Sequence, residues 1–252
     1  MSESPASEHH APFKESPKSL GLGNEFRPDD TLTALDNDPG HILRMRRASE
    51  YATLGRELSR NEQVRLLATT RDELNSLRDD FQIAVPEFQQ FISTSPDGQE
   101  ALYTRVEKVE GVDLDNITAH PSLYESLLSA NEMESWLSNL VAYIRDRYKN
   151  DATYMSDLLK PGQYRYGHTG GNPSNRIYLI DVDGQLASLA NPDERNSAFI
   201  HLGYLWSEFA KLADLPNSRQ ALTDLLNTAY DNGDIDEYAY NQAWDFIEDT
   251  PD

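Results

Sequence analysis

Two carboxylates, Asp181 and Asp183, follow a short run of mostly apolar residues that begins at Ile177. Such a run is typical of a buried strand that ends in a turn, here just before Gly184. Carboxylates are oxygen ligands of the kind that Mg²⁺ binds, and phosphoryl transfer uses them to hold the metal against the phosphates of a nucleotide. The alternative is a strand end with two solvated acids in a turn.

A second polar segment lies upstream, in Ser156–Tyr164. It contains the carboxylate of Asp157 and the side-chain amide of Gln163, and the turn-forming residues Pro161 and Gly162 lie between them. A carboxylate can accept a proton from a hydroxyl group, and a glutamine can supply a carbonyl oxygen to a metal. Without such a role, the segment is a helix-to-strand loop with ordinary turn residues.

Basic and glycine residues near the N-terminus offer groups that could contact phosphate. Arg44 lies in a strand-like segment with Arg46 and Arg47, and a guanidinium can contact phosphate through its planar fork. An exposed arginine on a strand is the alternative. Gly21 and Gly23 would allow a backbone to approach phosphate closely, but a plain flexible connection is the simpler interpretation.

The N-terminal half shows strand and helix patterns that could position these groups. Residues 1–18 are rich in Ser, Pro, Glu and His and have no apolar period, which predicts a disordered tail. The strand-like segments are 20–47, 88–93 and 101–109, and the helical segments are 51–58 and, after the capping-box pair Ser59 and Glu62, the stretch to Leu77.

The C-terminal half is mostly helical. Ser129 and Glu132 have capping-box spacing in front of a helix that carries Trp136 and Leu140 on one face. One predicted strand pair, 164–166 with 177–180, interrupts the helices, which continue as 196–213, 222–230 and 238–247.

This order of elements, together with these motifs, resembles the protein-kinase-like superfamily over about residues 20–215, and most nearly the aminoglycoside- and choline-kinase-like phosphotransferases. The resemblance implies an α+β, bilobal fold. After the tail 1–18, residues 19–110 would form a small β-rich lobe with a long helix, and residues 111–252 a mainly helical lobe. Val109–Gly111 would be the joint between them.

The resemblance implies roles for the polar segments of the second lobe. Asp181 would be the metal-binding aspartate, and Asp183 stands where protein kinases carry glycine but near where small-molecule kinases often place an acid. Leu159–Gln163 overlays the motif Leu-Lys-Pro-x-Asn, so Gln163 takes the position of the second metal ligand.

The position at which the family carries its catalytic aspartate is different in this sequence. In the same register Leu158 occupies that position, and the candidate base Asp157 stands one residue early. A one-residue bulge would be needed to bring Asp157 to the substrate hydroxyl. The histidine that usually precedes this position is absent, which places catalysis in doubt but leaves nucleotide binding open.

The resemblance also implies cofactor contacts in the first lobe and at the joint. Arg44 would contact the α- and β-phosphates of ATP. Its helical ion-pair partner would be Glu73, with Glu62 as the runner-up. Glu110 lies in the hinge, where the family holds adenine through backbone groups. ATP and Mg²⁺ are therefore the expected cofactors.

Composition limits the partners. The chain has 22 Lys and Arg against 43 Asp and Glu, a formal net charge of -21, which disfavours nucleic acid and anionic membrane surfaces as partners. The N-terminus has no secretory-signal pattern, and there is no cysteine, so a cytoplasmic protein is expected.

The stretch between Asp183 and Asn196 is short for a peptide-docking segment, which favours a small-molecule hydroxyl as the acceptor of the phosphoryl group.

Three functions stay open. The first is an ATP- and Mg²⁺-dependent phosphotransferase. The second is a catalytically degenerate pseudokinase that binds a nucleotide or a protein partner. The third is an acidic α+β interaction protein unrelated to kinases.

Overall fold

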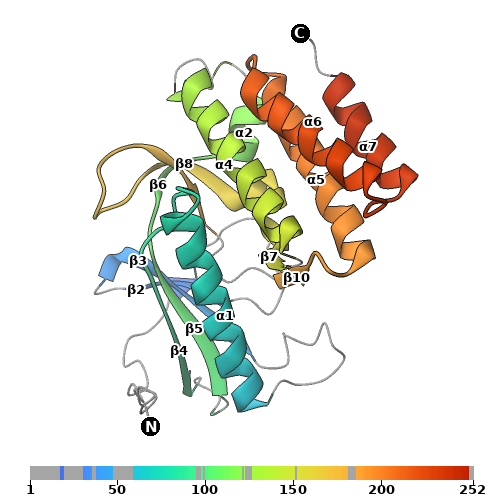
Figure 1. The fold of residues 1–252 in the computed structure, drawn as a ribbon. Helices are drawn as coiled ribbons and strands as arrows, with labels where there is room; N and C mark the ends of the chain where they lie inside the picture. The colour runs from blue at the N-terminus through green and yellow to red at the C-terminus, as the bar shows by residue number, and fades with distance from the viewer. Residues whose placement is uncertain are drawn as a thin grey trace. The chain divides into compact units, whose positions relative to one another are not determined.

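The structure, a computed structural model, describes residues 18–19, 31–35, 38–47, 59–94, 98, 100–120, 122, 127–150, 152–180 and 186–249. These residues form antiparallel sheets and several helices, which confirms the α+β class (Figure 1). They divide into two compact units. The first contains the described residues up to Thr69 and Glu87–Lys108, and the second contains Thr70–Pro86 and the described residues from Val109 onward.

The first unit contains a five-stranded antiparallel sheet. Its order is β1-β2-β3-β5-β4, and β4 and β5, which correspond to the predicted strand segments 88–93 and 101–109, pair as an antiparallel hairpin. The strands are β1 (Lys18–Ser19), β2 (Thr31–Leu35), β3 (Asp38–Arg47), β4 (Phe88–Thr94) and β5 (Glu100–Glu107).

One face of this sheet carries an apolar core. Leu43, Ala101 and Tyr103 are buried there, and Met45 and Phe91 pack against them. Strand residues alternate between the two faces, so the residue between Leu43 and Met45 points to the opposite face. That residue is Arg44, which is paired in register with Leu32 and Thr104.

A polar cluster fixes the start of β3 to β5. Arg105 donates from Nε to Asp38 at 2.9 Å, and the Nδ1 atom of His41 lies 2.7 Å from the same carboxylate. Burial alone would raise the pKa of Asp38, but the hydrogen bonds from Arg105 and His41 lower it below its usual value. The cluster therefore holds an ionised carboxylate in the sheet.

Helix α1 (Arg60–Asp79) begins where the sequence predicts. Ser59 donates from its backbone N–H to the Glu62 carboxylate at 2.9 Å, and Glu62 N–H returns a bond to Ser59 Oγ at 3.4 Å. This confirms the first capping box. The boundary between the two units falls within this helix, after Thr69.

The second unit contains two small sheets. The three-stranded sheet has the order β6-β8-β9, and β10 pairs with β7 in a separate two-stranded sheet. The predicted pair 164–166 with 177–180 is confirmed as β8 and β9, whereas β6, β7 and β10 were not predicted. The strands are β6 (Glu110–Asp113), β7 (Thr153–Met155), β8 (Tyr164–His168), β9 (Arg176–Leu179) and β10 (Leu186–Ser188).

Two glycines face each other where β6 pairs with β8. Gly111 and Gly167 are partners in register. A Cβ atom on Gly111 would lie 2.1 Å from Tyr166 O, and one on Gly167 would lie 2.0 Å from Glu110 O. Both distances are shorter than any real contact, so the two strands approach this closely only because neither position carries a side chain.

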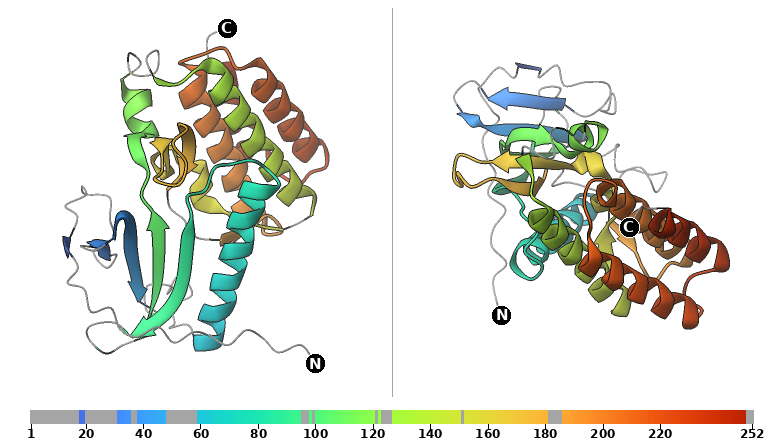
Figure 2. Two further views of the ribbon diagram at one scale, coloured as in Figure 1. Left: turned by 90° about the vertical axis from the view of Figure 1, so that its left-hand side faces the viewer. Right: turned by 90° about the horizontal axis from the view of Figure 1, so that it is seen from above.

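The helices of the second unit supply most of its core. Long helices run side by side, with α5 against α7 and α4 against α6 (Figure 2). Trp206, Phe199 and Phe209 of α5 and Met133 and Leu137 of α4 are among the largest fully buried side chains. The helices are α2 (Leu114–Ala119), α4 (Ala130–Lys149), α5 (Pro192–Ala210), α6 (Pro216–Asp231) and α7 (Glu237–Glu248).

The start of α6 is tied to α4 by polar contacts. Glu134 of α4 accepts from Ser218 N–H at 3.1 Å and from Ser218 Oγ at 2.6 Å. The same serine oxygen accepts from Trp206 Nε1 at 2.9 Å. Three helices therefore meet at one buried hydroxyl.

Ser129 caps helix α4 as predicted, and its removal is expected to cost about 1 kcal/mol of the free energy of unfolding. Ser129 Oγ accepts from Glu132 N–H, and the Glu132 carboxylate accepts from Ser129 N–H at 3.0 Å. Urea unfolding of Ser129→Ala tests this, with Ser174→Ala at an exposed loop position as the control. A loss no larger than in the control would contradict the capping role.

The unit boundaries differ in two ways from the expected lobes. The chain passes from the first unit to the second between Lys108 and Val109, two residues before the expected boundary. Residues 70–86 belong to the second unit, because Leu74, Leu77 and Ile83 are fully buried and Glu73 binds Arg147 of α4. The expected helix 51–58, Gly21 and Gly23 and all of the expected tail except Lys18 lie outside the described residues.

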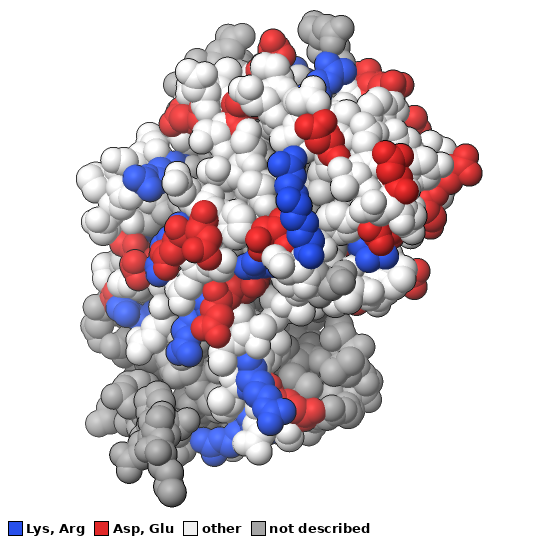
Figure 3. Space-filling model, viewed as in Figure 1, with Lys and Arg blue, Asp and Glu red and all other residues white. Residues whose placement is uncertain are grey.

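Charge is unevenly distributed along the second unit. After Arg219 the sequence contains no Lys or Arg, so α7 and the greater part of α6 carry only acidic charges. Figure 3 shows acidic side chains gathered over these two helices. Within the described residues, no helix is both long and apolar enough to cross a bilayer.

Candidate functional site

The polar segment after β7 forms two consecutive 3₁₀ turns. They are η2 (Ser156–Leu159) and η3 (Pro161–Gln163), and strand β8 follows directly. Lys160 N–H donates to Asp157 O at 3.2 Å, and Gln163 N–H donates to Lys160 O at 3.1 Å. We call Ser156–Gln163 the η-loop, after its two 3₁₀ turns. It contains the candidate residues Asp157 and Gln163.

Apolar side chains anchor the η-loop. Leu158 is fully buried and Leu159 is 2% exposed. Tyr164, also fully buried, donates from its hydroxyl to Leu158 O at 2.8 Å and packs edge-on against Trp136. Burial raises the pKa of the Tyr164 hydroxyl well above its usual value, so this donor stays protonated.

Asp157 is the acidic side chain that the η-loop offers. Its carboxylate is 16% exposed and lies 2.5 Å from the ammonium of Lys160, which is 59% exposed. Leu158, which the kinase resemblance placed in the register of the catalytic aspartate, is fully buried. The 3₁₀ turn thus places the carboxylate of Asp157 and the ammonium of Lys160 side by side.

Gln163 lies next to the end of strand β9. Its backbone carbonyl accepts from Ile180 N–H at 2.8 Å. Ile180 is the residue before Asp181 in the sequence, and both Asp181 and Asp183 lie outside the described residues. On the other side of that gap, Leu186 pairs in register with Met155, which immediately precedes the η-loop.

A buried network holds the beginning of the η-loop. Met155 N–H donates to the hydroxyl of Tyr143 at 3.2 Å, and that hydroxyl donates to the carboxylate of Glu73. Tyr143 is fully buried. Burial, and then the negative charge of Glu73, raises the pKa of Tyr143 well above its usual value, so its hydroxyl remains a donor. Helix α1 is therefore connected to the loop through one tyrosine.

Arg147 of α4 completes this network. It donates from Nε to Glu73 Oε1 at 2.8 Å and from Nη2 to Glu73 Oε2 at 3.3 Å, and it also donates to Ser76 Oγ at 2.8 Å. The guanidinium lies 5.0 Å from the ring centroid of Tyr143 and 5.7 Å from that of Phe81. Charge, hydrogen bonds and aromatic faces all orient this one side chain.

The predicted cofactor residues have different surroundings. Glu73, expected to pair with Arg44, is bound within the second unit by Arg147 and Tyr143, and its pairing with Arg44 stays a prediction. Glu110 begins β6 and pairs in register with His168. Because β6 is an edge strand of its described sheet, alternate backbone groups point away from β8. Adenine binding at Glu110 and phosphate binding at Arg44 stay predictions.

Four residues of this site were not identified from the sequence. Lys160 lies within the Leu-Lys-Pro run, and its position three residues after Asp157 was the available signal. Tyr143 and Arg147 stand four residues apart on α4, but nothing local indicates that they reach Glu73, which lies 70 and 74 residues earlier. Asp115 of α2 lies over the loop, since a Cβ atom on Gly162 would be 2.6 Å from its carboxylate.

The donor atoms of the η-loop fit a hard cation. Asp157 and Gln163 offer carboxylate and amide oxygens, the ligands that Mg²⁺ accepts. No cluster of three or more His, Asp or Glu side chains able to hold a metal occurs among the described residues. A magnesium site at the η-loop therefore needs the acids that follow Ile180.

Comparisons with known proteins find a likeness in structure but none in sequence. No family model matches the sequence, and no curated protein matches it. A solved structure described as "WaaP in complex with acyl carrier protein" is similar at 9% sequence identity, over 88% of this chain and 87% of that chain, with a TM-score of 0.47.

Proposed function

We propose that this chain is a kinase-like, ATP- and Mg²⁺-dependent phosphotransferase that acts on a small-molecule hydroxyl. The observation that carries the proposal is the hydrogen bond from Ile180 N–H to Gln163 O, at 2.8 Å. It brings the end of β9, which the sequence continues as Asp181, next to the loop that contains Asp157 and Gln163. This contact supports the proposal that the segments on which the kinase resemblance rests form one site.

Each residue has a role in this proposal. Asp181, with Gln163 and Asp183, holds Mg²⁺, which supplies neutralisation of the charge on the transferred phosphoryl group. Asp157 accepts the proton of the substrate hydroxyl. The ammonium of Lys160, beside Asp157 and largely exposed, attracts the phosphates. For Arg44 we propose a contact with phosphate and for Glu110 a contact with adenine. Both proposals rest on the kinase resemblance alone.

Glu73 has a positioning role in this proposal. Glu73 accepts a hydrogen bond from Tyr143, and the Tyr143 hydroxyl in turn accepts from the backbone N–H of Met155. Met155 directly precedes the η-loop. A loop fixed in this way presents Asp157 in one geometry, and positioning of this kind is where most of the catalytic effect of a phosphotransferase arises.

A second candidate is a degenerate pseudokinase that binds nucleotide without efficient transfer. The observation that favours it is the ion pair between Asp157 and Lys160, at 2.5 Å, in a turn whose next residue, Leu158, is buried in the core. In this geometry the Asp157 carboxylate is held by Lys160, and a substrate hydroxyl would have to compete with the ammonium for it. Binding and turnover must therefore be measured separately.

We expect ATP with Mg²⁺ to stabilise the protein, and Asp181→Ala to abolish most of that effect. A ligand at about 100 times its dissociation constant raises the free energy of unfolding by roughly 2.7 kcal/mol, which is readily seen as a higher melting temperature. Thermal melts with ATP alone, Mg²⁺ alone and both together measure the shift.

Asp214→Ala is the matched control for this experiment. Asp214 is an exposed acid in the loop between α5 and α6, so its removal changes the net charge equally without touching the η-loop. A Mg²⁺-dependent shift that survives Asp181→Ala would disprove the metal role of Asp181. No shift with millimolar ATP would disprove both nucleotide-binding candidates and leave the interaction-protein alternative.

A further inference from the structure

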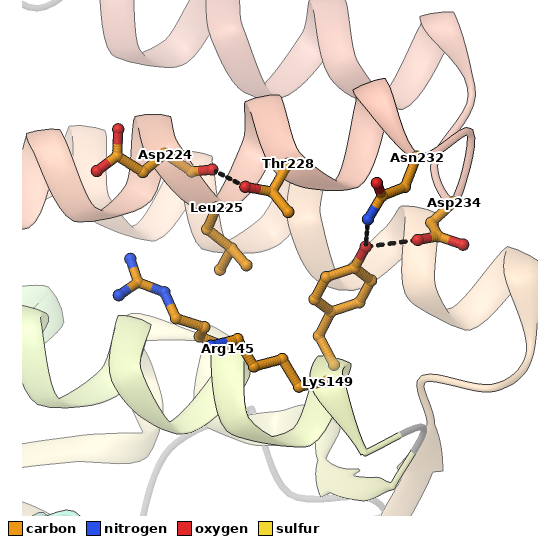
Figure 4. Close-up of a pocket in the computed structure, with 8 residues that line it drawn as sticks. Arg145, Lys149, Asp224, Leu225, Thr228, Asn232 and Asp234 are labelled. Carbon is orange, nitrogen blue, oxygen red and sulfur yellow. Dashed lines mark hydrogen bonds between the residues drawn. The ribbon is translucent and has the colours of Figure 1, made fainter.

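A cavity of about 580 Å³ lies within the second unit, between α4, α6 and the turn from α6 to α7 (Figure 4). Helix α4 contributes Arg145, Tyr148 and Lys149, α6 contributes Asp224 and Thr228, and the turn contributes Asp234. This volume is within the range of small-molecule sites. None of these residues belongs to the η-loop or to the network that holds it.

The α4 wall of the cavity is cationic. Arg145 and Lys149 are four residues apart, so their side chains lie on the same face of the helix. Arg145 Nη2 donates to Ala221 O at 2.7 Å, which orients the guanidinium while using one of its five N–H donors. Within the part of the chain that the structure describes, neither cation has a carboxylate oxygen within 4.0 Å.

Asp234, one of the two acids that line the cavity, already has polar partners. Asp234 accepts from the hydroxyl of Tyr148 at 2.5 Å, and its other oxygen lies 3.9 Å from Arg195 Nη2. Asn232 donates to the same tyrosine oxygen at 3.4 Å. These contacts engage both oxygens of Asp234 and hold the hydroxyl of Tyr148 in place at the cavity.

The α6 wall supplies hydrogen-bond acceptors. Asp224 Oδ1 accepts from Gln220 Nε2 at 2.7 Å, which leaves the second carboxylate oxygen as an acceptor. The hydroxyl of Thr228 donates to Asp224 O at 2.7 Å, which leaves its oxygen lone pairs as acceptors. A ligand with hydroxyl groups would find partners on this wall.

We propose that this cavity binds a small anionic polyol. Its phosphate or carboxylate group contacts Arg145 and Lys149 through charge-assisted hydrogen bonds. Its hydroxyl groups donate to Asp224 and Thr228, and its carbon skeleton lies over Tyr148 and Leu225, which also line the cavity. The site is independent of the proposed phosphotransfer, since it shares no residue with the η-loop.

Isothermal titration calorimetry with glucose 6-phosphate, gluconate and glucose tests this assignment. We expect one or both anions to bind with one-to-one stoichiometry, and glucose to bind at least about tenfold more weakly, because it lacks the charge-assisted bonds. The stronger of the two anions identifies the phosphate or the carboxylate as the preferred group. The double variant Arg145→Gln, Lys149→Gln should lose at least about tenfold in affinity for that anion.

A charge-matched double variant serves as the control. Lys211→Gln with Arg176→Gln removes the same charge at two other positions of the second unit and should leave the affinity unchanged. Lys149→Gln alone, at the exposed end of α4, repeats the test if the double variant does not fold. Its affinity should fall severalfold.

Three results would overturn the proposal. One is equal affinity in the cavity variants and the unsubstituted protein. Another is the absence of heat with either anion at about 10 mM, a concentration that would saturate a millimolar site. The third is binding that is lost in Asp181→Ala but kept in the cavity variants, which would place the anion at the metal and nucleotide residues instead.

Discussion

Arg147→Met is expected to lower the free energy of unfolding by about 3 kcal/mol, because it leaves a nearly buried carboxylate without its cation. The side chains of Arg147 and Glu73 are only 14% and 10% exposed. The substitution removes two hydrogen bonds to Glu73, one to Ser76 and the stacking on Tyr143. Urea unfolding followed by circular dichroism measures the change as a lower midpoint with an unchanged slope.

Arg145→Met, on the same helix, is the matched control. Its guanidinium donates to a backbone carbonyl instead of a carboxylate, so its loss should cost no more than about 1 kcal/mol. Glu73→Met combined with Arg147→Met should regain part of the loss, since no unpaired charge remains. Equal losses in Arg147→Met and Arg145→Met would contradict the role of the ion pair.

Asp157→Asn is expected to reduce Mg²⁺-dependent ATP turnover by about 10²- to 10⁴-fold, the usual contribution of a general base. The affinity for ATP should change little, because the proton acceptor contributes to the transition state more than to ground-state binding. Phosphate released from ATP measures turnover with water as the acceptor, and calorimetric titration of ATP measures affinity.

The comparison between turnover and affinity separates the two nucleotide-binding candidates. Asp214→Asn, the exposed acid used above, should alter neither quantity. Turnover that is unchanged in Asp157→Asn would remove Asp157 from the catalytic role. Tight ATP binding with no turnover in the unsubstituted protein would favour the pseudokinase.

Much of the fold could be predicted from local pattern. The capping boxes at Ser59 and Ser129 mark the starts of α1 and α4, and alternating residues mark the hairpin of β4 and β5. These signals depend on residues a few positions apart. Strands β7 and β10 have three residues each, too short for a period to be visible, and they exist because distant segments pair.

The candidate site was predictable only in part, for a related reason. Asp157 and Gln163 belong to one short segment, and the apolar run before Asp181 ends beside them. The partners of Glu73 depend instead on how α1 packs against α4, which no local spacing encodes. The one-residue offset of Asp157 could be seen in the sequence, but the 3₁₀ turn that buries Leu158 could not.

The facing pair Gly111 and Gly167 has a use in the search for distant relatives. Each position excludes a Cβ atom because of the backbone opposite it, so a larger residue at one cannot be compensated by a change at the other. Two chains that share this strand pairing must therefore both keep glycine at the two positions, however far the rest of their sequences has diverged. Two independently constrained glycines at this spacing are a criterion for relatedness that weak overall similarity cannot provide.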